Sequence, residues 1–306
     1  MPVQRSELSV RQKLVYRIGY GIVRCLLAGL LLVPYERRVA AAGWVSSRLA
    51  APLAGYRKRI RTNLQLVCPD LTRNEVDRLV QAVPDNAGRT IIEVFSTAPF
   101  VARSRAAELV GPGFKDLQTA RADGRPVIIV TAHFGNFYAI LGCMRALGYE
   151  MGALYRRMGN PYFNDHYLRH ISRLSGSVFE QGPQGMRDLI RHLRSGGMLG
   201  ILNDVHVAGG APLTFFGEPA KTSLATAELA LRFNCVLLPV YVQRQKNGLD
   251  FMIETRPPIG HSDPRTMTQA LNDDLERTVR DNMGQWFWIH RRWKDAPARD
   301  HIEHNG

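Results

Sequence analysis

Cysteine is scarce in this chain of 306 residues, which contains only Cys25, Cys68, Cys143 and Cys235 and no CxxC pair. The wide spacing argues against a structural disulfide or a cysteine-based zinc site and favours a reducing compartment. Cys143 and Cys235 lie in apolar stretches, so we expect both in the core. Internal repeats and low-complexity tracts are also lacking. The composition, 45% hydrophobic and 22% charged, is that of an ordinary globular protein.

Acidic residues are too few to balance the basic ones. The chain has 27 Asp and Glu against 40 Lys and Arg, a formal net charge of +13. Such a balance favours an acidic partner, which nucleic acid, an anionic membrane or an acidic carrier protein would each provide. Most of the excess is N-terminal: Met1–Thr62 holds twelve basic residues and two acidic ones, Glu7 and Glu36, a difference of +10.

Charges interrupt the run of about 20 apolar residues that a membrane span needs in the same N-terminal stretch, so a span and an interfacial helix both remain open. The most apolar part of this stretch is Cys25–Tyr35, and Arg17 and Arg24 precede it. The run ends in PYERR without a small-residue cleavage site, so we expect no signal peptide. Basic residues beside apolar helices predict a retained anchor that lies in or dips into an anionic membrane, with the bulk of the protein cytoplasmic. A buried core helix with a solvated basic face is the alternative.

We expect two regions, a membrane-associated helical region at 1–62 and an α/β domain at 63–306. Two or three helices should fill residues 8–60, with breaks near Pro34 and Pro52.

Farther along the chain, TRNE forms a capping box between Thr72 and Glu75 and predicts a helix start, with an interruption at Pro84. A further helix should follow at 86–100. From Pro126 onwards, short apolar strands alternate with amphipathic helices. We expect strands at 126–132, 152–156, 198–204, 235–244 and 250–256, and helices at 137–147, 161–174, 184–195, 222–233 and 265–282. The pattern predicts an α/β fold whose mixed, mostly parallel central sheet has helices on both faces.

Three reactive side chains directly follow expected strands, namely His133, Arg156 and Asp204. Ligands of open α/β sheets bind beyond the carboxyl ends of the strands, so the topology predicts a site at this edge. The ordinary pKa of histidine, about 6.5, makes His133 a usable base near neutral pH. The alternative for His133 is a cap of the helix that should begin near Asn136.

Five blocks resemble, in the same order, the HtrB-type lipid A biosynthesis acyltransferases over about residues 10–295. They are TAHFGNF, LYRRMGNPYFN, ILNDVHVAGGAPLTFFGEPAKTSLATAELALRF, LLPVYVQR and QWFWIHRRWK. FFGEPAKTS and QWFWIHRRWK are specific signals, whereas HFGNF alone is weak. These enzymes are similar to the wider glycerophospholipid acyltransferases, whose signature is a His, four residues, then Asp or Glu. The resemblance implies a fold of that type with His133 as the catalytic base.

The acidic position of this signature is Tyr138, which is a departure from the family pattern. A neutral phenol can orient an imidazole but supplies no negative charge. Another carboxylate could serve His133, the enzyme could work with the tyrosine, or the chain could be catalytically impaired. Asp204 matches the acidic position of the family's third block and is the best substitute, although it could instead cap the following loop. Glu218 and Glu228 are weaker candidates.

The resemblance also implies roles for residues around His133. Arg156 would bind a phosphate or polarise the acyl carbonyl, because a guanidinium is planar and always charged. Arg157 could take the same part, and a surface arginine is the alternative. From the residues themselves, Thr222 or Ser223 should cap a helix whose amino end could receive an anion, with Lys221 adding positive charge; a packing turn is the alternative. The residues assigned to substrate binding are Asn136, Arg157, Asn160, His206, Lys221 and Thr222.

Two further patterns have competing interpretations. QWFWIHRRWK interleaves aromatic and basic residues, which suits single-stranded nucleic acid or a membrane boundary, but we expect its tryptophans mainly to pack beneath the site. HYLRH places His166 and His170 at the i,i+4 spacing of zinc proteases but lacks their glutamate, so metal binding is not expected.

The function that the resemblance implies is transfer of a fatty acyl chain from acyl carrier protein to a hydroxyl of a lipid A precursor. It would take place at the cytoplasmic face of the inner membrane of a Gram-negative bacterium, through a peripheral or single-anchor attachment. Acyl carrier protein, the precursor and anionic membrane lipid are the implied partners, and neither a cofactor nor nucleic acid is expected. Acyl transfer to another glycolipid, an ornithine-type lipid or a lysophospholipid is one alternative. A catalytically impaired membrane-binding relative is another.

Overall fold

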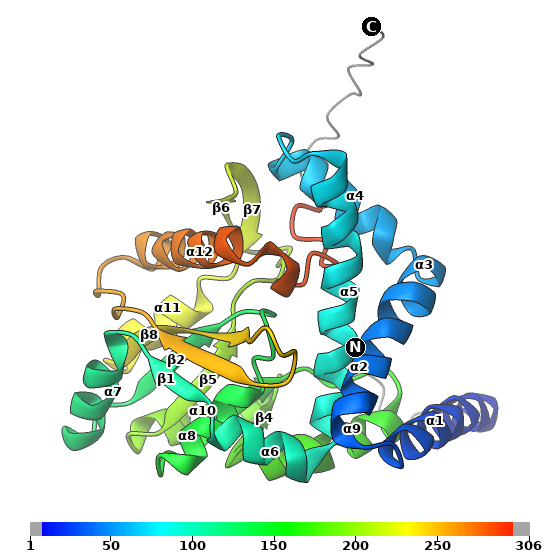
Figure 1. Ribbon diagram of the computed structural model, residues 1–306. Coiled ribbons are helices and arrows are strands. Elements are labelled where there is room, and N and C mark those ends of the chain that lie inside the picture. The colour runs from blue at the N-terminus through cyan, green and yellow to red at the C-terminus, as the bar shows by residue number, and fades with distance from the viewer. Residues whose placement is uncertain (1–7, 296–306) are drawn as a thin grey trace, which may run out of the picture.

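Residues 8–295 are described by the computed structural model, in which a seven-stranded sheet has helices on both faces (Figure 1). The sheet order is β1-β9-β8-β2-β5-β3-β4, and every neighbouring pair is parallel except the hairpin of β8 and β9. The predicted mixed, mostly parallel α/β sheet is thus confirmed. Its strands are β1 (Glu108–Val110), β2 (Val127–Thr131), β3 (Met151–Tyr155), β4 (Ser177–Glu180), β5 (Met198–Leu202), β8 (Val236–Arg244) and β9 (Phe251–Thr255).

The central strands bury both faces because they are apolar at successive positions. In β2, Val127 and Ile129 pack into one core cluster with residues of α6 (Thr97–Arg105), α7 (Gly113–Ala122), α8 (Ala139–Ala146) and α9 (Pro161–Leu174). Ile128 and Val130 point to the other face and pack with residues of α10 (Pro183–Arg194), α11 (Ala225–Arg232) and α12 (Pro264–Asp281). Cys143 and Cys235 are buried, as expected.

Helix α5 (Arg73–Phe95) confirms one sequence prediction and overturns another. The capping box is present, with the Thr72 side chain on the Glu75 amide and the Glu75 side chain on the Thr72 amide. The predicted interruption at Pro84 is wrong, since α5 continues through it as one helix. A proline inside a helix removes one backbone hydrogen bond. Close packing on α2 (Tyr35–Val45) keeps the helix whole, because Gly88 lets the backbone of Ala42 approach without a Cβ in between.

Short or polar elements were not anticipated. β1, β4 and α7 lie outside the expected segments, as does a separate two-stranded hairpin of β6 (Ala211–Phe215) and β7 (Glu218–Thr222). β7 reads EPAKT and has no apolar run, so its strand conformation depends on pairing with β6 rather than on local sequence.

The N-terminal region consists of α1 (Val10–Leu31), α2, a π-helix η2 (Ser46–Ala50), α3 (Ala51–Leu53) and α4 (Tyr56–Val67). The break near Pro34 is confirmed, whereas the break expected near Pro52 comes later, at Gly55, whose φ is +70°. The division into 1–62 and 63–306 remains a prediction, and its boundary falls inside α4. The 3-10 turn η3 (Met283–Gln285) follows α12 near the C-terminal end of the described chain.

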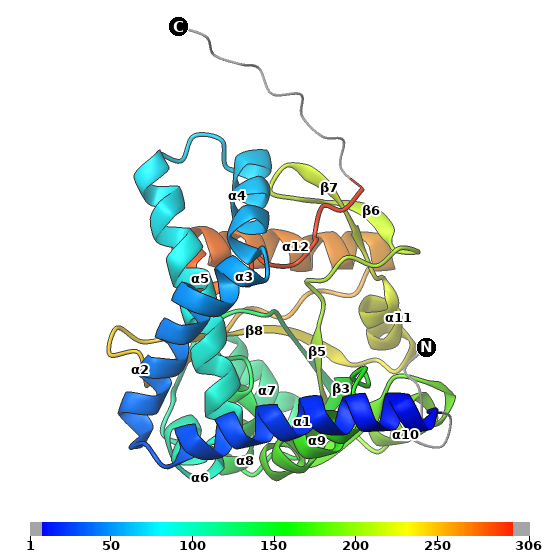
Figure 2. The same ribbon diagram turned by 90° about the vertical axis from the view of Figure 1, so that its right-hand side faces the viewer.

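Helix α1 is long and apolar enough to cross a membrane, and none of its residues is buried. The alternative of a buried core helix is therefore wrong. α1 lies along the outside of the protein beside α9 (Figure 2). The Asn160 side chain donates to the Tyr16 carbonyl at 2.9 Å, and the ring of Tyr20 stacks on that of Tyr162. Helix α1 thus makes specific contacts with α9 while its apolar side chains remain exposed.

Aspartate at Leu14, Ile18 and Ile22, which are 56–58% exposed, should move the full-length protein from the membrane to the soluble fraction. The reason is that each charge placed at the centre of a bilayer costs about 2.5–3.5 kcal/mol. The fold should persist, because none of the three side chains is buried. Fractionation of cell lysates measures the effect, and methionine at the same positions is the matched control. An aspartate variant that stays with the membranes would contradict the anchor.

Candidate active site

His133 and Asp204 meet because two parallel strands pair in register. Thr131 of β2 lies opposite Leu202 of β5, and each functional residue comes two positions later. The carboxyl ends of both strands thus bring an imidazole and a carboxylate to the same edge of the sheet. Of the three reactive residues predicted at this edge, these two are in direct contact. His133 Nδ1 lies 2.9 Å from Asp204 Oδ1.

The Asp204 carboxylate has three donors although its side chain is fully buried. Besides the His133 ring, the His133 backbone amide donates to Oδ2 at 2.9 Å, and the Trp286 indole donates to Oδ2 at 3.0 Å. Burial alone would raise the pKa of Asp204. The charge and hydrogen bonds of His133 outweigh burial and hold that pKa well below its usual range. Asp204 is therefore ionised at neutral pH.

An ionised Asp204 fixes the tautomer of His133. A carboxylate only accepts hydrogen bonds, so Nδ1 carries the proton and Nε2 is left as the basic nitrogen. The His133 side chain is 30% exposed, which leaves it open to a substrate. This is the arrangement of a general base with an orienting carboxylate.

His290 is a second histidine against the first, and its position was not anticipated. The two ring centroids lie 4.5 Å apart in an edge-to-face arrangement. Burial, together with the charge of His133, lowers the pKa of His290 to about 4, so the ring is neutral at pH 7. Its Nε2 is buried and has no hydrogen-bond partner among the described residues. A neutral ring here limits the water around His133 without competing for its proton.

The loop that carries His133 is held by one face of α5. Asn86 and Thr90 both donate to the Gly135 carbonyl, at 3.0 and 3.1 Å. Gly135 has a φ of +55°, and a Cβ there would collide with the carbonyl oxygen of Val242, so only glycine fits. One turn farther along α5, Glu93 accepts a 2.7 Å hydrogen bond from Asn136.

Asn136 and Glu93 are both fully buried, and Arg244 completes a buried network with two hydrogen bonds to Glu93, at 2.6 and 2.7 Å. The sequence predicts substrate binding for Asn136. Its side chain instead positions the loop, because its amide is bound to Glu93 and its oxygen accepts from the Tyr138 amide.

Tyr138, in the acidic position of the family signature, does not serve His133. Its hydroxyl hydrogen-bonds to that of Tyr167 at 2.8 Å. Burial raises the pKa of Tyr138 well above its usual range, and the neighbouring Tyr167 adds to the effect, so the phenol stays neutral. α8 begins at Ala139, and Tyr138 is its N-cap residue. The departure from the signature therefore leaves a neutral, partly buried hydrogen-bonded pair packed against the core.

The arginines after β3 have different environments. Arg156 is exposed and makes no hydrogen bond or ion pair with any residue that the structure describes. Arg157 pairs with Glu180, at 2.6 and 2.7 Å. β5 separates β3 from β2, so Arg156 is at the same edge as His133 but one strand farther away. Asn160 caps α9 and binds the Tyr16 carbonyl of α1, which is a structural role.

His206 and Lys221 share one carboxylate. His206 Nε2 and Lys221 Nζ contact Asp295 Oδ2, at 3.1 and 2.8 Å. These contacts connect the loop after β5 and strand β7 to the C-terminal segment. Thr222 is fully buried, donates to the Ala220 carbonyl and accepts from Arg292 at 2.7 Å.

Of the two predicted caps of the next helix, Thr222 and Ser223, only Ser223 contacts the start of that helix, and the N-cap position itself is Leu224. α11 begins at Ala225, whose amide donates to the Ser223 hydroxyl at 3.3 Å.

The C-terminal tryptophans are structural, as expected. Trp286, Trp288 and Trp293 are buried and pack against one another. The hydrogen bond from the Trp286 indole to Asp204 was not predicted. No sequence pattern near either residue predicts this hydrogen bond, because only the fold brings Trp286 and Asp204 together.

One group among the described residues has the spacing of metal ligands, namely His133, Asp204 and His290, whose ligand atoms lie within 4.8 Å of one another. Asp204, however, already accepts three hydrogen bonds, one of them from the ring of His133. A base and its orienting acid account for these contacts without an ion. His170 of the HYLRH motif contacts the Thr97 hydroxyl at 3.0 Å through Nδ1.

Residues 9–295 match the family model described as bacterial lipid A biosynthesis acyltransferase, nearly the whole chain. The chain belongs to this family. It is 23% identical to a lipid A biosynthesis acyltransferase of Haemophilus influenzae, over 89% of this chain and 86% of that protein. It is 24% identical to the lipid A biosynthesis lauroyltransferase of Escherichia coli, over 92% and 86% of the two chains. A phosphatidylinositol mannoside acyltransferase of Mycobacterium tuberculosis is also 24% identical, over 83% and 87%.

For an acyltransferase with this dyad, Asp204→Asn should lower kcat by roughly 10⁴, the loss seen when the equivalent carboxylate of serine proteases is neutralised. Asparagine keeps the shape but removes the charge that stabilises the imidazolium. Acyl-transfer rates measured on folded variants check the effect. Asp295→Asn is the matched control, because its carboxylate is exposed and bound to His206 and Lys221, and it should stay within about threefold of wild type. Equal losses in both variants would argue against the dyad.

The lowered pKa of His290 predicts acid-sensitive folding. Between pH 6.5 and 4 the unfolded chain binds a proton on this ring that the folded chain excludes. The free energy of unfolding should therefore fall as the pH drops through this window, by up to about 3 kcal/mol. His290→Phe should lose less stability between pH 7 and 4.5 in denaturant titrations of the detergent-solubilised protein. His170, whose pKa is also lowered, titrates in both proteins and cancels. Identical losses in variant and wild type would contradict the effect.

Proposed function

We propose that this acyltransferase moves a fatty acyl chain from acyl carrier protein to a hydroxyl of a lipid A precursor. Nε2 of His133 accepts the proton of a hydroxyl on an already attached 3-hydroxyacyl chain. The hydroxyl oxygen attacks the thioester carbonyl and forms a tetrahedral intermediate. The C–S bond then breaks, and the leaving thiolate takes the proton from His133. No covalent enzyme intermediate and no cofactor is needed.

The observation that carries this proposal is the pairing of His133 with the buried, ionised Asp204. The carboxylate stabilises the imidazolium that forms while the hydroxyl loses its proton. It also supports an active enzyme despite Tyr138, because the negative charge beside His133 comes from the neighbouring strand. The possibility of a catalytically impaired relative rested on that missing acid.

Arg156 is proposed to stabilise the oxyanion or to bind a phosphate of the acceptor. Its guanidinium is exposed and unpaired among the described residues, whereas Arg157 is occupied by Glu180. A preorganised cation near the reacting carbonyl lowers the barrier because charge develops on that oxygen.

The proposed location is the cytoplasmic face of the inner membrane. Acyl carrier protein and anionic membrane lipid are acidic partners that suit the excess of basic residues, and α1 provides an apolar anchor. Nucleic acid is not a proposed partner.

The decisive assay is transfer of radiolabelled acyl groups from acyl carrier protein to a tetra-acylated lipid A precursor. Wild type should be active and His133→Ala inactive, and the wild-type rate should fall with ionic strength as carrier docking is screened. Tyr138→Glu should bring no gain, because the hydroxyl at position 138 points to Tyr167 rather than to His133. Inactive wild type together with active Tyr138→Glu would show a disabled site instead. A rate insensitive to salt would contradict electrostatic docking of the carrier.

A second acceptor deserves a parallel assay. The similarity to a mycobacterial phosphatidylinositol mannoside acyltransferase extends over 83% of this chain. The same dyad would serve a hydroxyl of another glycolipid. Transfer to a phosphatidylinositol mannoside, with none to the lipid A precursor, would select this alternative.

A further inference from the structure

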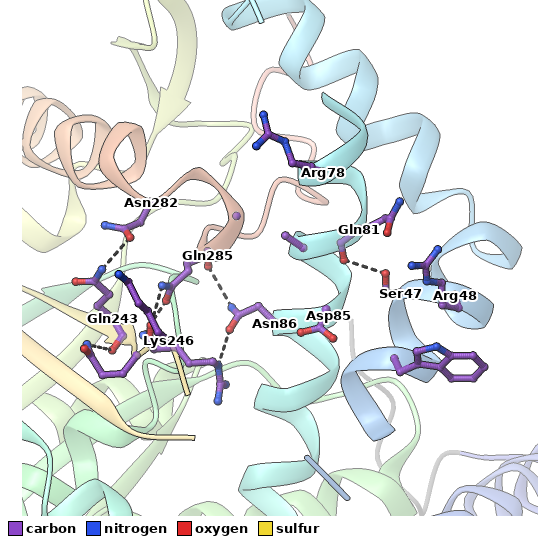
Figure 3. A pocket seen from close by; sticks show the side chains of 15 residues that line it. Ser47, Arg48, Arg78, Gln81, Asp85, Asn86, Gln243, Lys246, Asn282 and Gln285 are labelled. Carbon is purple, nitrogen blue, oxygen red and sulfur yellow. Dashed lines mark hydrogen bonds between the residues drawn. The ribbon is translucent and has the colours of Figure 1, made fainter. Parts of the chain in front are cut away.

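A cavity of about 670 Å³ lies apart from the His133–Asp204 dyad, between α5, the α2–η2 segment and the hairpin of β8 and β9 (Figure 3). Neither dyad residue lines it, and His290 does not either. Its volume is within the range of small-molecule sites, roughly 300–1,000 Å³. The cavity therefore lies outside the group of residues that the proposed chemical step uses.

The charge of the cavity is positive once internal ion pairs are set aside. Asp85 is paired with Arg89, and Arg244 is paired with Glu93. Arg48 and Lys246 remain, and neither has a hydrogen bond or an ion pair with another described residue. Arg78 adds a third cation, with a single long hydrogen bond to a backbone carbonyl of its own helix. These exposed cations come from η2, the hairpin and α5, so they border the cavity from three sides (Figure 3).

The rest of the lining is rich in amides and hydroxyls, including Gln81, Asn86, Gln243 and Gln285. Such groups suit a ligand with several hydroxyls as well as anionic groups. One wall contains the π-helix η2, which contributes Ser47 and Arg48. π-helical turns are rare and are frequent at functional sites.

The walls are firmly placed. α2 and α5 approach closely at two glycines, where a Cβ on Gly43 would meet Asp85 and one on Gly88 would meet Ala42. The Ser47 hydroxyl also donates to the Gln81 carbonyl at 2.9 Å. The cavity is therefore largely preformed, which lowers the entropy cost of binding.

The elements that form one wall also expose apolar side chains. Trp44 lines the cavity and is 57% exposed, and Leu49 and Leu53 are exposed on η2 and α3. The chain order connects them directly to the anchor helix α1. A polar, cationic cavity beside an apolar surface fits the headgroup of an amphiphile whose chains stay in the membrane.

We propose that this cavity binds the phosphorylated sugar headgroup of an anionic glycolipid, with Arg48, Arg78 and Lys246 on its phosphates. The assignment rests on the proposed function for the class of lipid, and on the cavity itself for the site. Two residues that line the cavity are also hydrogen-bonded to the loop that carries His133. Asn86 of the cavity donates to the Gly135 carbonyl, and the Gln285 carbonyl accepts from the Gly135 amide at 3.0 Å.

The test uses the full-length protein in neutral detergent and a phosphorylated diglucosamine without acyl chains as the probe. Binding is followed by equilibrium dialysis and by the fluorescence of Trp44, the exposed one of the four tryptophans. The wild type and His133→Ala should bind equally. Arg48→Gln/Lys246→Gln should bind at least about tenfold more weakly, because two charged contacts are lost. Arg105→Gln/Lys115→Gln removes the same charge from exposed positions outside the cavity and should bind like wild type.

Three results would overturn the site: no binding of the probe, equal binding of unphosphorylated diglucosamine, or an equal loss in the control variant. Inorganic phosphate alone should bind more weakly than the sugar phosphate, and equal binding would reduce the site to one for free phosphate.

Acyl-transfer assays on the same preparations identify the source of the headgroup. A raised KM for the lipid acceptor in Arg48→Gln/Lys246→Gln supports the acceptor as the ligand, and an unchanged KM supports a second glycolipid. Probe binding by a wild type without transfer activity would leave the site standing while the proposed function fails.

Discussion

The buried charge of Asp204 is the constraint on which the rest of the site depends. An unpaired carboxylate in the interior would take up a proton, and a protonated acid could not stabilise an imidazolium. Asp204 stays ionised because three donors meet it, from the His133 ring, the His133 amide and the Trp286 indole. These donors belong to two segments far apart in the chain. The active site therefore exists only when the sheet edge and the C-terminal segment are both in place.

The C-terminal segment is in turn held by the N-terminal helices and by the sheet. Asn63 of α4 donates to the carbonyls of Trp288 and His290, at 2.7 and 2.9 Å. At the end of β8, the side-chain amide of Gln285 accepts a hydrogen bond from the Arg244 amide and donates one to the Arg244 carbonyl. α4 thus links the helices that follow α1 to the segment that carries Trp286 and His290.

The sequence was informative where local pattern decides structure. Apolar runs located β2, β3, β5, β8 and β9, and parallel strands necessarily bring His133 and Asp204 to one edge. It was uninformative where distant residues decide. The burial of Asn136 depends on Glu93 of α5, and the continuity of α5 through Pro84 depends on its packing against α2. The indole of Trp286 could be assigned to the core from its neighbours, but its partner Asp204 lies 82 positions away.

Tyr138 shows why the family signature is not a strict physical requirement. An acid at this position would be buried and would need a cationic or hydrogen-bonding partner, whereas the phenol needs one neutral hydroxyl, which Tyr167 supplies. Because the pKa of Tyr138 is raised by burial, no charge enters this part of the core at neutral pH. The proposed reaction requires a negatively charged group hydrogen-bonded to Nδ1–H of His133, whichever element provides it. Parallel pairing of β2 with β5 places Asp204 against Nδ1 of His133, so no acid is needed from the helix that begins at Ala139.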